Sequence, residues 1–79
     1  MNLTIKYYAF LRDKAGVSSE VIDVDIRTAE ELYNLLNEKY QFQIDKSQLR
    51  VAVNDEFVDF NTSLVGNDKV VFIPPVAGG

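Results

Sequence analysis

The feature that most restricts the fold of this 79-residue chain is a single amphipathic helix, predicted over residues 28–40. It begins with a capping box, in which the Thr28 hydroxyl accepts a hydrogen bond from the N–H of Glu31 and the Glu31 carboxylate accepts one from the N–H of Thr28. Apolar residues at helical spacing predict its buried stripe: Ala29, Leu32, Leu35, Leu36 and Tyr40. One helix of this length covers only one face of a sheet, so the strands around it indicate an α+β fold.

Five other segments have the alternation and composition of β-strands: residues 3–10, 20–26, 50–54, 57–58 and 69–73. In the first segment, one face is predicted to hold Leu3, Ile5, Tyr7 and Ala9, and the opposite face Lys6, Tyr8 and Phe10. A short helical turn is predicted over residues 11–15, closed by Gly16. Leu64 is expected to fill the core beneath the loop before the last strand. Pro74 ends that strand because it has no N–H to donate.

The order of these elements is strand, strand, helix, strand, short strand, strand. It resembles the β-grasp (ubiquitin-like) fold, in which the first and last strands lie parallel at the centre of a mixed sheet and the helix packs across one face. We therefore predict one β-grasp domain over residues 1–73 and an extended tail over residues 74–79.

The composition excludes several classes of site. The chain has no Cys and no His, which removes disulfides, Cys-ligated metal sites, thiol nucleophiles and imidazole bases. The net charge of −4 argues against a nucleic-acid partner, because binding phosphates requires a basic face. The sequence has no visible signal peptide and no apolar run long enough to span a bilayer. We therefore expect a cytoplasmic protein without a membrane partner.

The sequence ends in Pro74-Pro75-Val76-Ala77-Gly78-Gly79, which predicts a stiff stalk with a thin tip able to enter a narrow tunnel. The α-carboxylate of Gly79 is ionised at neutral pH and is a poor electrophile, so it must be activated before it reacts. Adenylation is the activation we expect. The chain has no phosphate-binding loop and no apparent base, so an ATP-using partner must carry out this step.

Several stretches resemble the small, sulfur-carrier subunit of molybdopterin synthase, the ubiquitin-like MoaD family. The matching residues are Tyr8-Ala9-Phe10-Leu11-Arg12-Asp13, Val51-Ala52-Val53-Asn54, Leu64, Asp68-Lys69-Val70, Phe72 and the six-residue ending. The family usually has Gly-Asp before the last strand, where this chain has Asn67-Asp68. Asn tolerates a left-handed turn better than other non-Gly residues, so we expect the turn to be kept.

This resemblance implies that Gly79 is the reacting residue. An adenylating, E1-like enzyme would use ATP to activate it, and sulfur from a persulfide donor would convert it to a thiocarboxylate. The tail, through Gly78, Ala77, Val76, Pro75 and Pro74, would enter the large subunit of molybdopterin synthase. There the sulfur would attack cyclic pyranopterin monophosphate, and two transfers would build the dithiolene. The resemblance implies no cofactor bound to the carrier, which is not catalytic alone.

Tyr8, Phe57 and Ile73 are predicted to form an apolar partner-binding patch on the sheet face away from the helix. Arg12 is a candidate for pairing with an acidic group of the partner. The alternatives are local packing under loops for the apolar residues and simple solvation for Arg12. Four acidic residues lack the spacing of a calcium-binding loop, and we interpret them as turn residues and not as a metal site: Asp13, Asp55, Asp59 and Asp68.

Three other functions remain open at this point. A ubiquitin-like modifier, joined through Gly79 to lysines of other proteins, would begin with the same adenylation. A thiamine-pathway sulfur carrier also ends in Gly-Gly, although the Pro-Pro-Val segment argues against it. A β-grasp binding module with an inert terminus is the fourth hypothesis.

Overall fold

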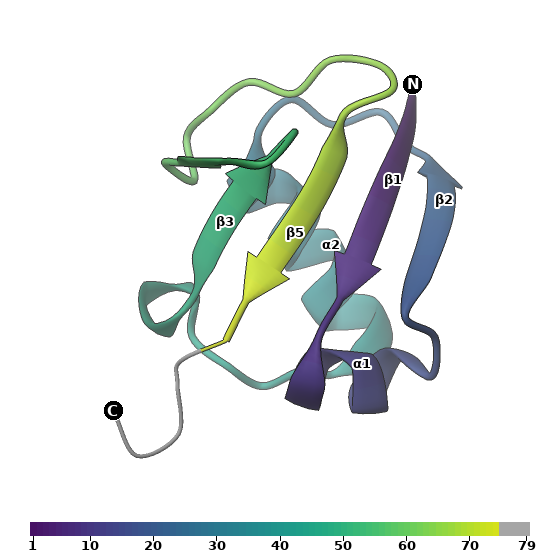
Figure 1. Cartoon of the computed structure of the whole chain (residues 1–79), viewed down its shortest axis with the longest axis vertical. Helices are drawn as coiled ribbons and strands as arrows, with labels where there is room; N and C mark the ends of the chain where they lie inside the picture. Colours follow the sequence, from purple (N-terminus) through teal and green to yellow (C-terminus); the bar gives the residue numbers. More distant parts are fainter. Residues whose placement is uncertain (75–79) are drawn as a thin grey trace.

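A mixed sheet of five strands forms the centre of the molecule (Figure 1). The computed structural model describes residues 1–74, and within them the strands are β1 (Asn2–Tyr7), β2 (Ser19–Asp23), β3 (Arg50–Val53), β4 (Glu56–Val58) and β5 (Lys69–Ile73). Their order across the sheet is β2-β1-β5-β3-β4. The central strands β1 and β5 are parallel, and the other neighbours are antiparallel. The predicted α+β fold with β-grasp topology is confirmed.

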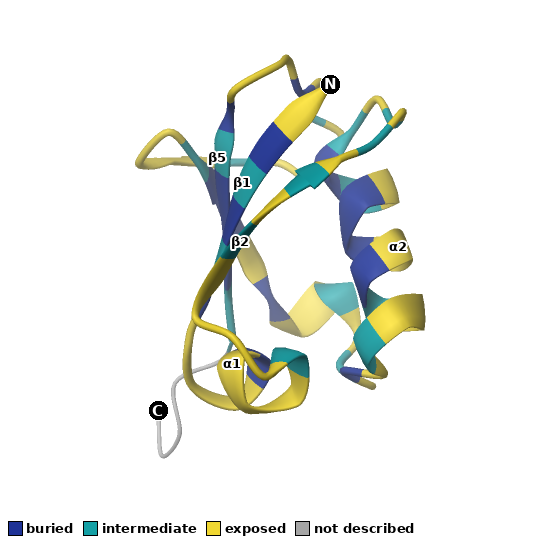
Figure 2. Cartoon of the chain, turned by 90° about the vertical axis from the view of Figure 1, so that its right-hand side faces the viewer, coloured by how far each residue is buried: buried dark blue, intermediate teal, exposed yellow. Residues whose placement is uncertain are grey.

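The helix α2 (Ala29–Tyr40) lies across one face of this sheet (Figure 2). As predicted, the Thr28 hydroxyl accepts a hydrogen bond from the N–H of Glu31, at 3.2 Å. The Glu31 carboxylate, however, accepts from the N–H of Arg27 at 3.1 Å and not from Thr28. An isolated bridge between Thr28 and Ser63 keeps the backbone before the helix extended. The Glu31 carboxylate is therefore bonded to the N–H of Arg27, one residue before Thr28.

The buried stripe of α2 differs from the prediction at one position. Leu35 is 37% exposed, whereas Tyr33, which was not expected in the stripe, is only 2% exposed. Ala29, Leu32 and Leu36 are buried as predicted, and Tyr40 is partly buried. At about 100° per residue, Tyr33 lies roughly 55° from the centre of the stripe formed by Ala29, Leu32, Leu36 and Tyr40, and Leu35 roughly 105°. The prediction assigned Leu35 to the buried stripe because leucine is apolar, but the helical geometry puts Tyr33 there.

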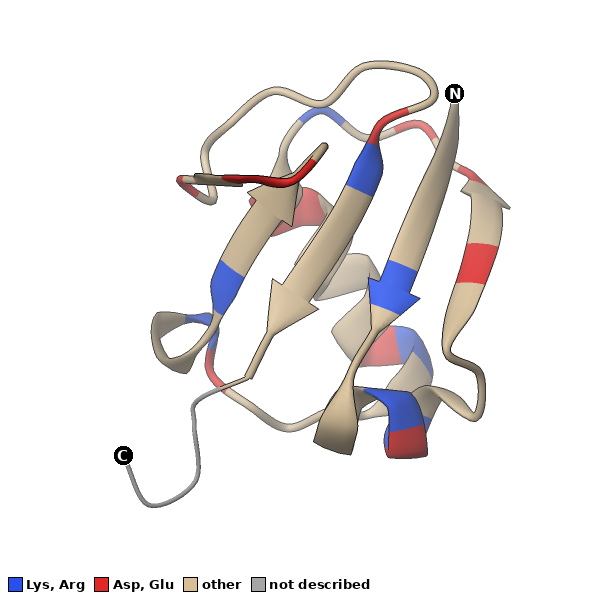
Figure 3. Cartoon of the chain, viewed as in Figure 1, with Lys and Arg blue, Asp and Glu red and all other residues tan. Residues whose placement is uncertain are grey.

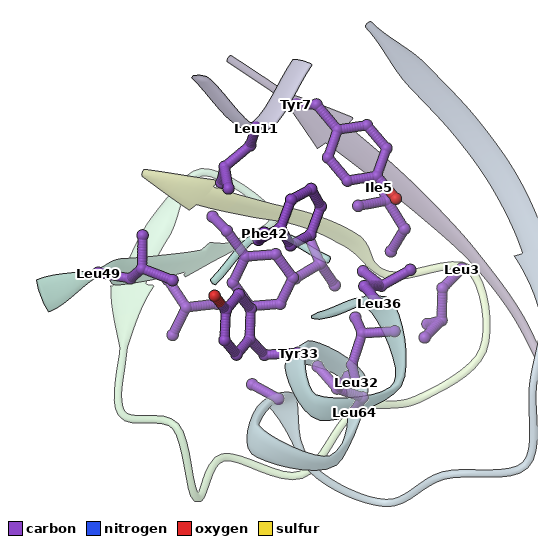
Figure 4. Close-up of a cluster of buried hydrophobic side chains, with 14 residues drawn as sticks. Leu3, Ile5, Tyr7, Leu11, Leu32, Tyr33, Leu36, Phe42, Leu49 and Leu64 are labelled. Atoms are coloured by element: carbon purple, nitrogen blue, oxygen red, sulfur yellow. The ribbon is translucent and has the colours of Figure 1, made fainter. Parts of the chain in front are cut away.

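The core between α2 and the sheet is rich in aromatic rings (Figure 4). The ring of Tyr33 lies 5.4 Å from that of Phe72 and 6.1 Å from that of Phe42, measured between centroids. Phe42, which the sequence pattern did not single out, is fully buried just after α2. Leu64 is buried beneath the loop before β5, as predicted. This side of the sheet is therefore closed by packing.

The first two strands are shorter than predicted. β1 ends at Tyr7, and the helix α1 (Ala9–Ala15) begins where the strand was expected to continue. Ala9, predicted to face the core, is exposed and has a positive φ of 49°. This turn brings Leu11 into the core at the end of the sheet, where it is fully buried. β2 likewise ends at Asp23 and not at residue 26.

The predicted turns are confirmed and give the sheet its register. Asn54 and Asp55 both have positive φ, at 52° and 73°, which suits the two-residue hairpin between β3 and β4. Asn67 has φ 72° ahead of β5, so Asn takes the left-handed position as expected. Gly16 closes α1 with φ 79°. A short 3-10 helix, η1 (Lys46–Gln48), leads into β3. No helix within residues 1–74 is long and apolar enough to cross a membrane.

Candidate partner-docking surface at the base of the tail

The chain leaves the sheet at the carboxyl end of β5, beside α1 and the start of β3 (Figure 1). Ile73 is the last residue of this central strand, and Pro74 is the last residue that the structure describes. The other predicted tail residues lie outside the described part of the chain: Pro75, Val76, Ala77, Gly78 and Gly79. Their predicted roles stay predictions. What the structure defines is the surface at the base of the tail.

The sheet face away from α2, here called the outer face, presents a row of side chains beside β5. The strand register places Val71 opposite Ala52 and Lys6, and Ala52 opposite Phe57. Phe57 is 57% exposed, although it lies on a strand. This row therefore leads from the central strands to an exposed aromatic ring at the edge.

Three of the four predicted partner-binding residues lie at this end of the molecule, whereas Phe57 lies on the edge strand β4, level with the middle of β5. Tyr8 follows directly after Tyr7, which is aligned with Phe72, so Tyr8 lies level with Ile73 on the neighbouring strand. Tyr8 is 50% exposed and Ile73 is partly buried. Arg12 is exposed on α1, and its N–H donates to the carbonyl of Tyr8 at 3.4 Å. Tyr8 was predicted to lie in the first strand, but it is the N-cap residue of α1.

The structure adds a residue that the sequence analysis missed. Arg50, the first residue of β3, is paired with Ile73, and its guanidinium carbon lies 3.8 Å from the centroid of the Phe57 ring. A signal for it was present: residues 50, 52 and 57 share one face once the turn at Asn54 and Asp55 fixes the hairpin register. Arginine and aromatic residues are both enriched at protein interfaces, and arginine is attracted to the face of an aromatic ring.

Charge is distributed unevenly over the outer face (Figure 3). Near the start of β5, Lys69 pairs with Asp55 at 3.1 Å between Nζ and Oδ1. Toward the end of β5, Lys6 and Arg50 flank the strand, and neither has an ion pair with another described residue. On the outer face of the strands, this end therefore carries basic side chains, although α1 and the segment before η1 also carry the acidic residues Asp13 and Asp45 (Figure 3).

A polar network on the inner side supports this end of the sheet. The Glu20 carboxylate accepts hydrogen bonds from the hydroxyls of Tyr7, at 2.5 Å, and Tyr40, at 2.6 Å. Burial opposes ionisation of Glu20, but the hydrogen bonds from Tyr40 and Tyr7 and the charge of Lys39 outweigh it and lower its pKa. Burial and the nearby Glu20 carboxylate raise the pKa of Tyr7. The network ties β1, β2 and α2 together on the inner side of the sheet.

Two of the four aspartates interpreted as turn residues, Asp55 and Asp68, lie at turns and have side-chain partners, whereas Asp13 lies within the helix α1, contrary to that interpretation. Asp68 is buried and accepts hydrogen bonds from the Asn54 side chain, at 2.8 Å, and from the N–H of Val65, at 2.9 Å. The backbone carbonyl of Asp59 accepts from the N–H of Thr62. Among residues 1–74, no three acidic side chains come together as a metal site would require.

Comparison with known proteins assigns the chain to a family. The sequence profile of the ThiS family matches residues 5–79, which is nearly the whole chain. The chain belongs to the ThiS family. This confirms the predicted kinship with ubiquitin-like sulfur carriers.

Individual relatives agree with this assignment over their full lengths. A curated protein of Haemophilus influenzae, named molybdopterin synthase sulfur carrier subunit, is 29% identical and covers 98% of this chain and 99% of its own length. The structure of a putative molybdopterin converting factor subunit 1 of Pyrococcus furiosus has 26% identity and a TM-score of 0.81, covering 96% of this chain and 99% of that one. The Helicobacter pylori complex of subunits 1 and 2 of molybdopterin-converting factor includes a chain with 25% identity and a TM-score of 0.68, with both chains fully covered.

Proposed function

We propose that this protein is the sulfur-carrier subunit of a molybdopterin synthase and that it transfers sulfur from a thiocarboxylate at Gly79. One combination carries the proposal: an end-to-end match to curated molybdopterin synthase sulfur carrier subunits in a chain that ends in Pro-Pro-Val-Ala-Gly-Gly. The β-grasp fold supports it because β5 delivers this ending from the centre of the sheet, next to an exposed aromatic surface. We place the reaction in the cytoplasm, where ATP is available.

The proposed chemistry begins in an adenylating partner. The Gly79 carboxylate attacks the α-phosphorus of ATP, and pyrophosphate leaves. The terminal sulfur of a persulfide donor then attacks the acyl-adenylate, and AMP leaves. A thiol reduces the resulting sulfur–sulfur bond, which releases the thiocarboxylate and forms a disulfide with the donor. This chain contributes the acyl group and its accessibility, since it has neither Cys nor His to catalyse these steps.

Delivery of the sulfur requires a second partner, the large subunit of the synthase. The tail from Pro74 to Gly79 enters that subunit while Tyr8, Phe57, Ile73 and Arg12 dock against its surface. Exposed aromatic side chains next to partly buried aliphatic ones are typical anchors for such contacts. The sulfur then attacks cyclic pyranopterin monophosphate, and two loaded carriers supply the two sulfurs of the dithiolene.

Mass spectrometry of the C-terminal peptide, residues 70–79, tests the charging step. The chain is incubated with ATP, the adenylating enzyme of its own organism and a persulfide donor, and the enzyme is shown to be active on a second carrier. We expect one oxygen of Gly79 to be replaced by sulfur. An unchanged carboxylate would contradict the proposal, and an isopeptide link from Gly79 to lysine would favour the modifier function instead.

A bulky substitution at Gly78 tests whether the thin tip matters. Gly78→Val should leave the thermal unfolding midpoint unchanged, because the residue follows the folded domain, but it should block entry into the partner. Normal sulfur transfer by this variant would contradict the role given to the tail.

A further inference from the structure

Arg50 occupies a defined place at the base of the tail. It is paired with Ile73, the last residue of β5, and its guanidinium carbon lies 3.8 Å from the centroid of the Phe57 ring. Arg50 itself is exposed. A charged group is therefore held over the aromatic ring, one strand away from the point where the chain leaves the sheet.

Contact with the ring orders this side chain without consuming its hydrogen-bonding capacity. The guanidinium has five N–H donors in its plane, and contact with the face of an aromatic ring uses none of them. No ion pair joins Arg50 to another residue of the described chain. An arginine ordered in this way loses less side-chain entropy when it binds a carboxylate in a bidentate manner.

The surrounding charges favour an acidic partner at this position. Lys6 lies on the same face, across β5 from Arg50, and it too has no ion pair among the described residues. Asp59 follows β4 at the position opposite Arg50 in the hairpin register, but no ion pair joins them among the described residues, and Asp55 in the hairpin turn is paired with Lys69. Two cations flanking an apolar strand fit a protein surface that places carboxylates around an apolar centre.

We propose that Arg50, held on the Phe57 ring, determines which large subunit this carrier accepts, by binding a carboxylate beside the opening that receives the tail. The inference rests on the proposed function, because that function identifies the partner. Arg50 is then a specificity residue: it acts in docking and makes no contact with the reacting atoms at Gly79.

The test compares the binding of Arg50 variants to the large subunit of the same organism. Calorimetry gives the Kd of the unmodified chain and of the Arg50→Ala, Arg50→Glu and Arg50→Lys variants at low and high salt, about 50 and 300 mM. Arg27→Glu is the matched control, because Arg27 is also exposed but precedes α2 on the opposite side of the molecule. Thermal melts show whether each variant is folded.

We expect Arg50→Ala to weaken binding about tenfold and Arg50→Glu about a hundredfold, with Arg50→Lys in between. The control should stay within about twofold, since charges beyond a Debye length are screened. The dependence of Kd on salt should be smaller for Arg50→Ala than for the unmodified chain. In sulfur transfer from the thiocarboxylated chain, Arg50→Glu should raise KM for the carrier and leave kcat unchanged.

Two results overturn the proposal, and they are distinguishable. If the unmodified chain binds and transfers sulfur but Arg50→Glu binds within about twofold of it, the inference fails while the proposed function stands. In that case Arg50 only shields Phe57. If the unmodified chain does not bind the large subunit at all, while a subunit pair from another organism does, the proposed function fails together with the inference.

Discussion

The two faces of the sheet are built from the same five strands but carry different kinds of side chains (Figure 2). Under α2, the strands contribute Tyr7, Val70 and Phe72, which are almost completely buried. On the outer face they contribute Lys6, Arg50 and the exposed ring of Phe57. The inner face is explained by apolar packing and by the hydrogen bonds to Glu20. The outer face keeps apolar and basic groups in contact with solvent, where they add little stability.

In a small β-grasp protein, the face that stability does not explain is the one on which function is expected. A sheet face with no binding role would not require an exposed aromatic ring with an arginine held over it. Substitutions on the inner face should therefore change stability, and those on the outer face should change partner binding. The predictions below test that division, from the largest expected change in stability to the smallest.

The largest loss is expected at the centre of the inner face. Phe72 is fully buried and contacts the rings of Tyr33 and Phe60. Phe72→Ala should lower the free energy of unfolding by about 3–5 kcal/mol, measured by urea denaturation. A domain of this size has only roughly 4–12 kcal/mol in total, so the variant should be close to unfolding. A loss below about 1 kcal/mol would show that the inner face is not the source of stability.

A smaller loss is expected from the hydrogen-bond network around Glu20. Glu20→Gln removes the charge that accepts both tyrosine hydroxyls and should cost about 1–2 kcal/mol, because charged hydrogen bonds are stronger and this site is partly exposed. Glu38→Gln is the control, since Glu38 is exposed on the same helix. Equal stability of the two variants in urea would contradict the role of the network.

The same network predicts a dependence on pH. The pKa of Glu20 is lower in the folded chain than its ordinary value of 4.5, so ionisation favours folding. This contribution is fully present above the unfolded pKa and is lost as the pH falls through the folded pKa. Below about pH 4.5 the original chain should therefore lose more stability than Glu20→Gln. Parallel acid unfolding curves for the two proteins would contradict this prediction.

The helix cap should contribute less. Thr28→Ala removes the hydroxyl that accepts from the N–H of Glu31 and should cost about 1 kcal/mol. Thr28→Ser keeps the acceptor and should remain within about 0.5 kcal/mol of the original chain. Thermal melts of the three proteins measure this difference, and identical midpoints for Ala and Ser would show that the cap does not contribute.

The smallest change in stability is expected at Phe57. Phe57→Ala removes an exposed ring and its contact with Arg50, so the free energy of unfolding should change by about 0.5–1 kcal/mol or less. Its affinity for the large subunit should nevertheless fall at least about tenfold. Val21 is also exposed on the outer face, but it lies on β2, at the opposite edge of the sheet. Val21→Ala should change neither the free energy of unfolding nor the affinity for the large subunit. If Phe57→Ala destabilises the fold as Phe72→Ala does, the division between the faces is wrong.

The inner face could largely be predicted from the sequence because periodicity is a direct consequence of burial. The alternation over β5 and the capping box before α2 gave the strand and the helix start correctly. Leu35 and Tyr33 were confused because both are apolar and only two residues apart. The end of β1 was misplaced because the alternation continued through Tyr8 and Phe10. No glycine or other turn residue in this segment indicated the positive φ of Ala9.

The outer face was predictable only in part. Alternation placed Tyr8 and Ile73 on the sheet face away from the helix, but Arg50 was recognised only when the register paired it with Ile73 and brought it over Phe57. The network around Glu20 was not predicted, because it joins three elements that are distant in the sequence. Contacts of this kind depend on strand order and register, which residue patterns alone do not fix.

The most direct test of the account is a single-turnover reaction with chemically thiocarboxylated chain, the large subunit of its organism and cyclic pyranopterin monophosphate. The account predicts formation of the dithiolene product, with two carriers consumed for each product and the mass of Gly79 returning to that of a carboxylate. A large subunit that is active with another organism's carrier, but forms no product with this chain, would contradict the account.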